Sequence, residues 1–214
     1  ARGSVTANAL PRGPDAVHPW AGAVMISFSA VFVRLADVEA ARSSFLRVAY
    51  ALPILAVAVM VARRRSQVLR GPVLVPLAVV AGLFLGLDLF AWHASIGLIG
   101  AGLGTVLPNL QVVFVGVVGV ALFGERPRPA FWYALPVVLA GVWLLSAVGE
   151  AVTVEDRVGW GVALGVVTAV FYTAFLVLLR VARLRRPHAG ALEVLLSATL
   201  GASVTTGIAA LVDG

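Results

Sequence analysis

The chain has 214 residues, of which 61% are hydrophobic and 12% charged, and it contains no cysteine. A soluble domain has about 25% charged residues, so this composition excludes an ordinary water-soluble globule and a disordered chain. The mean hydropathy of +1.02 indicates a protein that is embedded in lipid. The lack of cysteine excludes disulfides and thiolate metal sites. The three histidines, His18, His93 and His188, do not follow metal-ligand spacing, and we expect no cofactor.

Seven apolar segments follow one another along the chain, each close to the roughly 20 residues that a helix needs to cross a bilayer. They lie at about 20–36, 44–62, 73–97, 103–123, 129–148, 159–179 and 190–211. Only four charged residues fall inside these limits: Arg34, Arg47, Asp88 and Glu193. A charge inside the bilayer is costly, so this partition predicts an all-α protein with seven membrane helices. A cleaved signal peptide is the alternative for the first segment.

The arginines predict how these helices are oriented. Twelve of the 16 basic residues lie in the N-terminal stretch and in the second, fourth and sixth connections, whereas the opposite side carries only Arg42 and Arg157. Because basic residues stay on the cytoplasmic side, we expect a cytoplasmic N-terminus and an outer Gly214. Short arginine clusters between apolar runs also argue against nucleic-acid binding, despite the pI near 11.2.

Small residues recur at four-residue spacing, as Gly82/Gly86 and Gly161/Gly165. Such surfaces are typical of membrane helices that pack closely, so we expect a packed bundle.

The first and sixth segments share a weak internal repeat. Trp20 and Ala30-Val31-Phe32 have counterparts in Trp160 and Ala169-Val170-Phe171, at an offset of 139–140 residues. A chance match is the alternative. A repeat unit of five helices would be inverted in its second copy, as in many secondary transporters.

Several short motifs follow in a characteristic order. They are Leu87-Asp88-Leu89-Phe90-Ala91-Trp92-His93-Ala94-Ser95, Gly104-Thr105-Val106-Leu107-Pro108-Asn109-Leu110, Gly124-Glu125-Arg126 and Gly141-Val142, with Arg47 in the second segment. In order and spacing the chain resembles the EamA domain of the drug/metabolite transporter superfamily. This resemblance implies a ten-helix bundle of two inverted five-helix repeats, with both termini cytoplasmic. Members move amino acids, nucleotide sugars or drugs through a central cavity.

The resemblance also implies a domain organisation. Residues 1–18 would be a cytoplasmic tail, 19–148 the first EamA repeat, 149–158 an outer loop, and 159–214 the first two helices of the second repeat. The chain departs from the family because Pro108 precedes Asn109, whereas many members have a proline after that asparagine. Three expected helices do not follow the seventh. We therefore expect a piece of a longer transporter, with a complete seven-helix protein as the alternative.

We predict seven solute-binding residues: Asp88, Trp92, Ser95, Arg47, Tyr50, Asn109 and Tyr172. Asp88, Trp92 and Ser95 share a helix face, and a carboxylate inside the bilayer needs a partner or a wet cavity. The alternatives are structural: Asp88 pairs two helices, Arg47 pairs with Asp88 or reaches the interface, and Asn109 makes an interhelical hydrogen bond. His93 is interpreted as a packed histidine rather than a proton relay. Thr168 shares the face of Tyr172, and Glu193 is expected to form an interfacial ion pair.

The function predicted from the sequence is secondary transport of a small metabolite or drug by alternating access, in a bacterial plasma membrane and without enzymatic activity. No phosphate-binding G-x-x-x-x-G-K-[ST] loop occurs in the sequence, which argues against ATP hydrolysis by this chain. The expected partners are a small-molecule substrate and membrane lipid, with a homodimer as a candidate assembly and no nucleic acid. The alternatives are a seven-helix receptor, a structural membrane subunit, or an intramembrane enzyme that acts on lipid.

Overall fold

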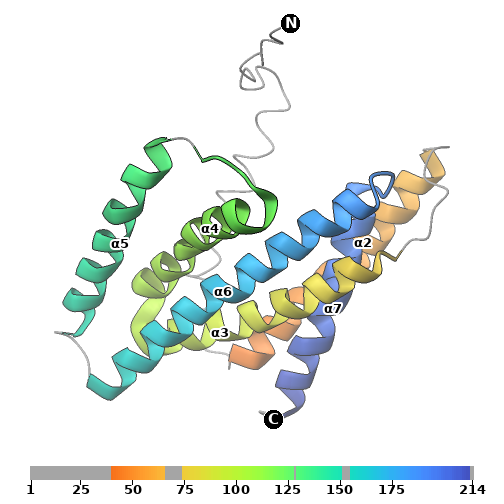
Figure 1. Ribbon diagram of the computed structural model, residues 1–214. Coiled ribbons are helices and arrows are strands. Elements are labelled where there is room, and N and C mark those ends of the chain that lie inside the picture. Colours follow the sequence, from red (N-terminus) through yellow and green to blue (C-terminus); the bar gives the residue numbers. More distant parts are fainter. Residues whose placement is uncertain (1–39, 66–73, 128, 151–154, 213–214) are drawn as a thin grey trace, which may run out of the picture.

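The computed structural model describes residues 40–65, 74–127, 129–150 and 155–212, and these residues form helices with no strand among them (Figure 1). The helices are α2 (Ala40–Arg65), α3 (Pro76–Val106), the 3₁₀-helix η2 (Leu107–Leu110), α4 (Gln111–Phe123), α5 (Pro129–Glu150), α6 (Glu155–Arg185) and α7 (Ala191–Val212). The predicted tail at 1–18 and the first predicted segment, 20–36, lie outside the described residues. Helices α5 and α6 extend into both ends of the predicted outer loop, 149–158.

Four helical stretches are long and apolar enough to cross a membrane: Ala41–Arg64, Pro76–Phe123, Arg157–Arg185 and Ala191–Val212. Three of them coincide with predicted segments, so the all-helical prediction is confirmed for the described residues, and these helices have the length and composition of membrane spans. The count differs from the sequence prediction. Segments 73–97 and 103–123 fall in one continuous helical stretch, and among the described residues α5 provides only the shorter apolar stretch Pro129–Val138.

The long stretch from Pro76 to Phe123 folds back on itself at Gly100. This residue has φ 82° and ψ 168°, a conformation that glycine adopts without a Cβ clash. A Cβ placed on Gly104 would lie only 3.1 Å from Cα of Ile96. Eight residues of straight helix would separate those positions by about 12 Å. The chain therefore reverses at Gly100, and Figure 1 shows α4 leaving this turn in the direction opposite to α3.

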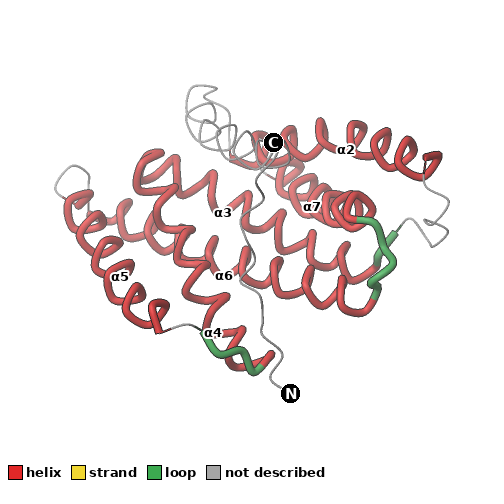
Figure 2. The backbone as a smooth tube through the Cα atoms, turned by 90° about the horizontal axis from the view of Figure 1, so that it is seen from above, coloured by secondary structure: helices red, strands yellow, loops and turns green. Residues whose placement is uncertain are grey.

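Helix α3 lies between α6 on one side and α7 with α2 on the other (Figure 2). Glycines allow these close approaches. A Cβ on Gly82 would collide with the carbonyl oxygen of Ala198 in α7, and one on Gly165 in α6 would meet the Leu107 side chain at 2.6 Å. The packing surfaces predicted from the glycine spacing are therefore confirmed.

The arginine-rich ends of α2, α4 and α6 lie at one end of the bundle. Arg63 Nε at the end of α2 lies 2.6 Å from Glu193 Oε1 at the start of α7. Arg180 near the end of α6 pairs with Glu125, just after α4, at 2.5 Å. The two ion pairs thus join elements that flank the second, fourth and sixth connections, the three connections in which the sequence concentrates its arginines.

Candidate functional site

Asp88 is a carboxylate in the middle of an apolar helix. It lies in α3 and is 7% exposed. Among the described residues no hydrogen bond or ion pair engages its oxygens, although Arg47 of α2 and Tyr172 of α6 are close enough to interact with its charge. Burying a carboxylate without a direct partner costs free energy. Asp88 is therefore unfavourable in a purely hydrocarbon environment.

Arg47 uses an aromatic ring rather than a carboxylate as its contact. Its guanidinium carbon lies 5.5 Å from the centroid of the Trp92 ring, within the range of a cation–π interaction. Trp92 also packs against a small apolar cluster of Val48, Leu89 and Ala202. The direct Arg47–Asp88 ion pair that the sequence left open is not formed, and the two charges remain near each other without contact.

The other predicted site residues lie elsewhere or use their polar atoms in the fold. Ser95 is fully buried, and its hydroxyl donates a hydrogen bond of 2.8 Å to the Gly161 carbonyl of α6. Asn109 donates from Nδ2 to the Thr105 carbonyl at 3.0 Å. Tyr50 is 70% exposed on α2. The structure therefore brings together Asp88, Trp92, Arg47 and Tyr172, and solute contact by Ser95, Tyr50 and Asn109 stays a prediction.

Two buried polar atoms without partners extend this cluster. His93 is 3% exposed, and its Nδ1 lies 2.6 Å from the Leu89 carbonyl and 2.9 Å from Ser44 Oγ. A carbonyl only accepts, so we assign the proton to Nδ1, which makes Nε2 an acceptor in the neutral ring. Within the part of the chain that the structure describes, neither His93 Nε2 nor the Thr168 hydroxyl has a hydrogen-bond partner. The sequence placed Thr168 on the face of Tyr172 but did not include it in the site.

The register of α3 against α6 places Thr168 at the level of Asp88. The two helices are antiparallel, because Ser95 bonds to Gly161 while Ala81 packs in one cluster with Phe175. Asp88 is midway between Ser95 and Ala81, and Thr168 is midway between Gly161 and Phe175. The carboxylate and the hydroxyl therefore occupy the same layer of the bundle, with Tyr172 one turn away.

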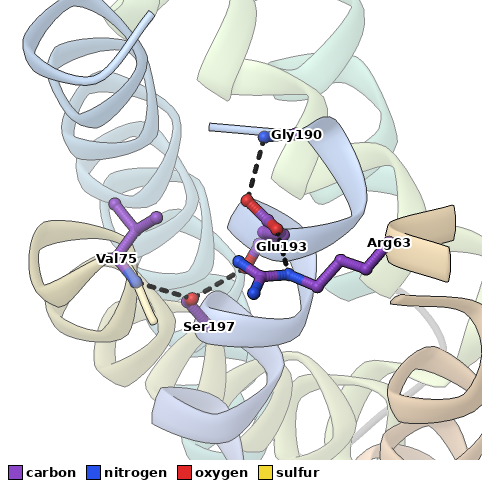
Figure 3. A network of polar contacts seen from close by, with 5 residues as sticks. All are labelled: Arg63, Val75, Gly190, Glu193 and Ser197. Atoms are coloured by element: carbon purple, nitrogen blue, oxygen red, sulfur yellow. Dashed lines mark hydrogen bonds and ion pairs between the residues drawn. The ribbon is translucent and has the colours of Figure 1, made fainter. Parts of the chain in front are cut away.

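A second polar network closes the end of the bundle (Figure 3). Glu193, 3% exposed, accepts hydrogen bonds from Arg63 Nε at 2.6 Å and from the Gly190 N–H at 3.1 Å. Ser197 Oγ donates to the Glu193 carbonyl and accepts from the Val75 N–H. The network joins the end of α2, the residue before α3 and the start of α7. The predicted ion pair of Glu193 is confirmed, and its carboxylate is more deeply buried than an interfacial position suggests.

Comparison of the chain with protein families, with curated proteins and with solved structures finds no match. The described residues also contain no group of three histidine, aspartate or glutamate side chains that could hold a metal ion.

Proposed function

We propose that the chain belongs to a secondary transporter of the EamA type, which moves a small metabolite or drug by alternating access. In this proposal the chain supplies seven spans of a ten-helix bundle with inverted repeats. The reversal at Gly100 supports two crossings between residues 73 and 123, because α3 and α4 run in opposite directions. The arginine-rich helix ends gathered on one side support a plasma-membrane protein whose N-terminus is cytoplasmic.

The observation that carries the proposal is the buried Asp88 without a direct partner. The same chain shows what a structural buried carboxylate looks like, because Glu193 is bonded to both Arg63 and Gly190. Asp88 instead lies in a layer with the unpartnered Thr168 hydroxyl, and Arg47 rests on Trp92. A polar layer of this kind in a bilayer is typical of a solute pathway, where water or solute supplies the missing partners.

Uptake into membrane vesicles tests the proposal. Cells would express the complete reading frame, and the probes would be ethidium, a labelled amino-acid mixture and a labelled nucleotide sugar. At least one probe should accumulate above vesicles that lack the protein. Asp88→Asn should lower that uptake about tenfold or more. Glu125→Gln, the matched control at an exposed ion pair, should leave uptake within about twofold of the parent.

Two results would contradict the proposal. The first is that no probe accumulates above the background of empty vesicles. The second is that Asp88→Asn and Glu125→Gln give the same uptake kinetics at equal protein amounts, which would leave Asp88 with a structural role only.

A further inference from the structure

A small apolar pocket lies between the end of α2 and the start of α7. Its volume is about 160 Å³, and its lining residues are Val59, Ala62, Gly190, Ala191, Leu192 and Glu193. Among the described lining residues Glu193 is the only charged one, and its two carboxylate oxygens are already bonded to Arg63 and to the Gly190 N–H. The pocket therefore offers hydrocarbon contacts to an occupant and does not offer a free carboxylate (Figure 3 shows this carboxylate).

The end of the bundle around this pocket carries excess positive charge. Of the described residues there, Glu125 and Glu193 are the acidic ones, and each is in an ion pair with an arginine. Exposed arginines without an acidic partner among the described residues remain at this end: Arg64, Arg126, Arg183, Arg185 and Arg186.

One of these arginines is next to the pocket. Arg186 lies in the tight turn before α7, where its carbonyl accepts a hydrogen bond of 3.1 Å from the Ala189 N–H, and the pocket lining begins at the following residue, Gly190. Arg64 points away from the pocket, because it lies on the face of α2 opposite to Val59 and Ala62. Positive charge and apolar lining thus meet in the segment that leads into α7.

We propose that this pocket binds an anionic phospholipid, with an acyl chain against Val59, Ala62 and Leu192 and the headgroup phosphate near Arg186. The pocket lies where the apolar helices give way to their arginine-rich ends, the depth at which a phospholipid changes from chain to headgroup. Basic pockets between membrane helices are a recurrent form of anionic-lipid site. A soluble anion would satisfy the arginines but would leave the apolar lining unused.

Native mass spectrometry of the detergent-solubilised chain tests the site, with phosphatidylglycerol and phosphatidylcholine of identical acyl chains as probes. The parent should bind phosphatidylglycerol more tightly than phosphatidylcholine. Replacing Arg186 by glutamine should raise the dissociation constant for phosphatidylglycerol about fivefold. Arg126→Gln, a control at the same end but in the α4–α5 connection, should change it less than about twofold.

A second pair of variants tests the apolar half of the site. Ala62→Phe fills the pocket and should weaken both lipids, whereas Val120→Phe on the exposed surface of α4 should weaken neither. Equal affinity of the parent for the two lipids would overturn the proposal. Equal effects of Arg126→Gln and Arg186→Gln would do so as well, since they would show diffuse attraction only. Displacement of the lipid by millimolar inorganic phosphate would identify a simple anion site instead.

Discussion

Replacing Glu193 by glutamine should destabilise the protein far more than the same change at Glu125. The Arg63 and Glu193 side chains are 25% and 4% exposed, whereas those of Arg180 and Glu125 are 45% and 46% exposed. Removing one partner of a buried ion pair costs about 3–5 kcal/mol because the remaining side chain loses a buried ionic contact. Arg63 keeps a quarter of its surface in solvent, so we expect the lower end of that range, about 3 kcal/mol. For Glu125→Gln we expect about 0.5 kcal/mol.

The measurement is the free energy of unfolding in mixed micelles, obtained by titration with a denaturing detergent. Single and double variants of Arg63→Gln and Glu193→Gln form a cycle that isolates the pair, and we expect a coupling energy of about 1–3 kcal/mol. The same cycle at Arg180 and Glu125 is the matched control. If the two glutamate variants lose equal stability, or if the coupling at Arg63–Glu193 is no larger than the control, burial does not decide the strength of these pairs.

Further substitutions test the packing and the orientation of the helices. Gly82→Ala should lower the free energy of unfolding by about 1–3 kcal/mol because the methyl group meets the α7 backbone. A Cβ added at Gly97 would meet nothing within 4 Å, so Gly97→Ala should leave the free energy of unfolding unchanged or raise it. Equal melting temperatures of the Gly82→Ala and Gly97→Ala variants would contradict this contrast. Ser95→Ala should cost about 0.5–1.5 kcal/mol through its lost interhelical hydrogen bond, so an unchanged melting curve would exclude that role. An impermeant maleimide on intact cells should label Arg157→Cys and not Ser66→Cys, and the reverse pattern would refute the orientation.

Much of the helix placement could be predicted because the length of an apolar run is a local property of the sequence. Segment 44–62 lies inside α2, segment 159–179 lies inside α6, and segment 190–211 is matched by α7 within a residue at each end. The gap between the predicted segments 73–97 and 103–123 contains Gly100, but the sequence did not single out this residue as the turn. Several glycines occur between residues 97 and 104, and only the packing of Gly104 against Ile96 decides which of them takes the positive φ.

Part of the candidate site could also be predicted, because the periodicity within one helix is a local property of the sequence. Helical periodicity alone places Asp88 and Trp92 on one face, and the structure brings Arg47 of α2, which was also a predicted site residue, close to both. The hydrogen bond of Ser95 to α6 and the outward position of Tyr50 depend on how helices are rotated against their neighbours. That rotation is set by packing across long stretches of chain, which the spacing within one helix does not encode.

The contact between α3 and α7 has a consequence for the order in which the protein assembles in the membrane. Thr205 of α7 bonds to the Leu83 carbonyl of α3, 122 residues earlier in the chain. At about 5–20 residues per second, a ribosome needs about 6–24 s to synthesise that interval. During this time the Gly82 and Gly86 surface of α3 has no α7 to cover it. A ribosome that stalls before residue 198 therefore leaves α3 in the bilayer with its glycine surface open to other helices.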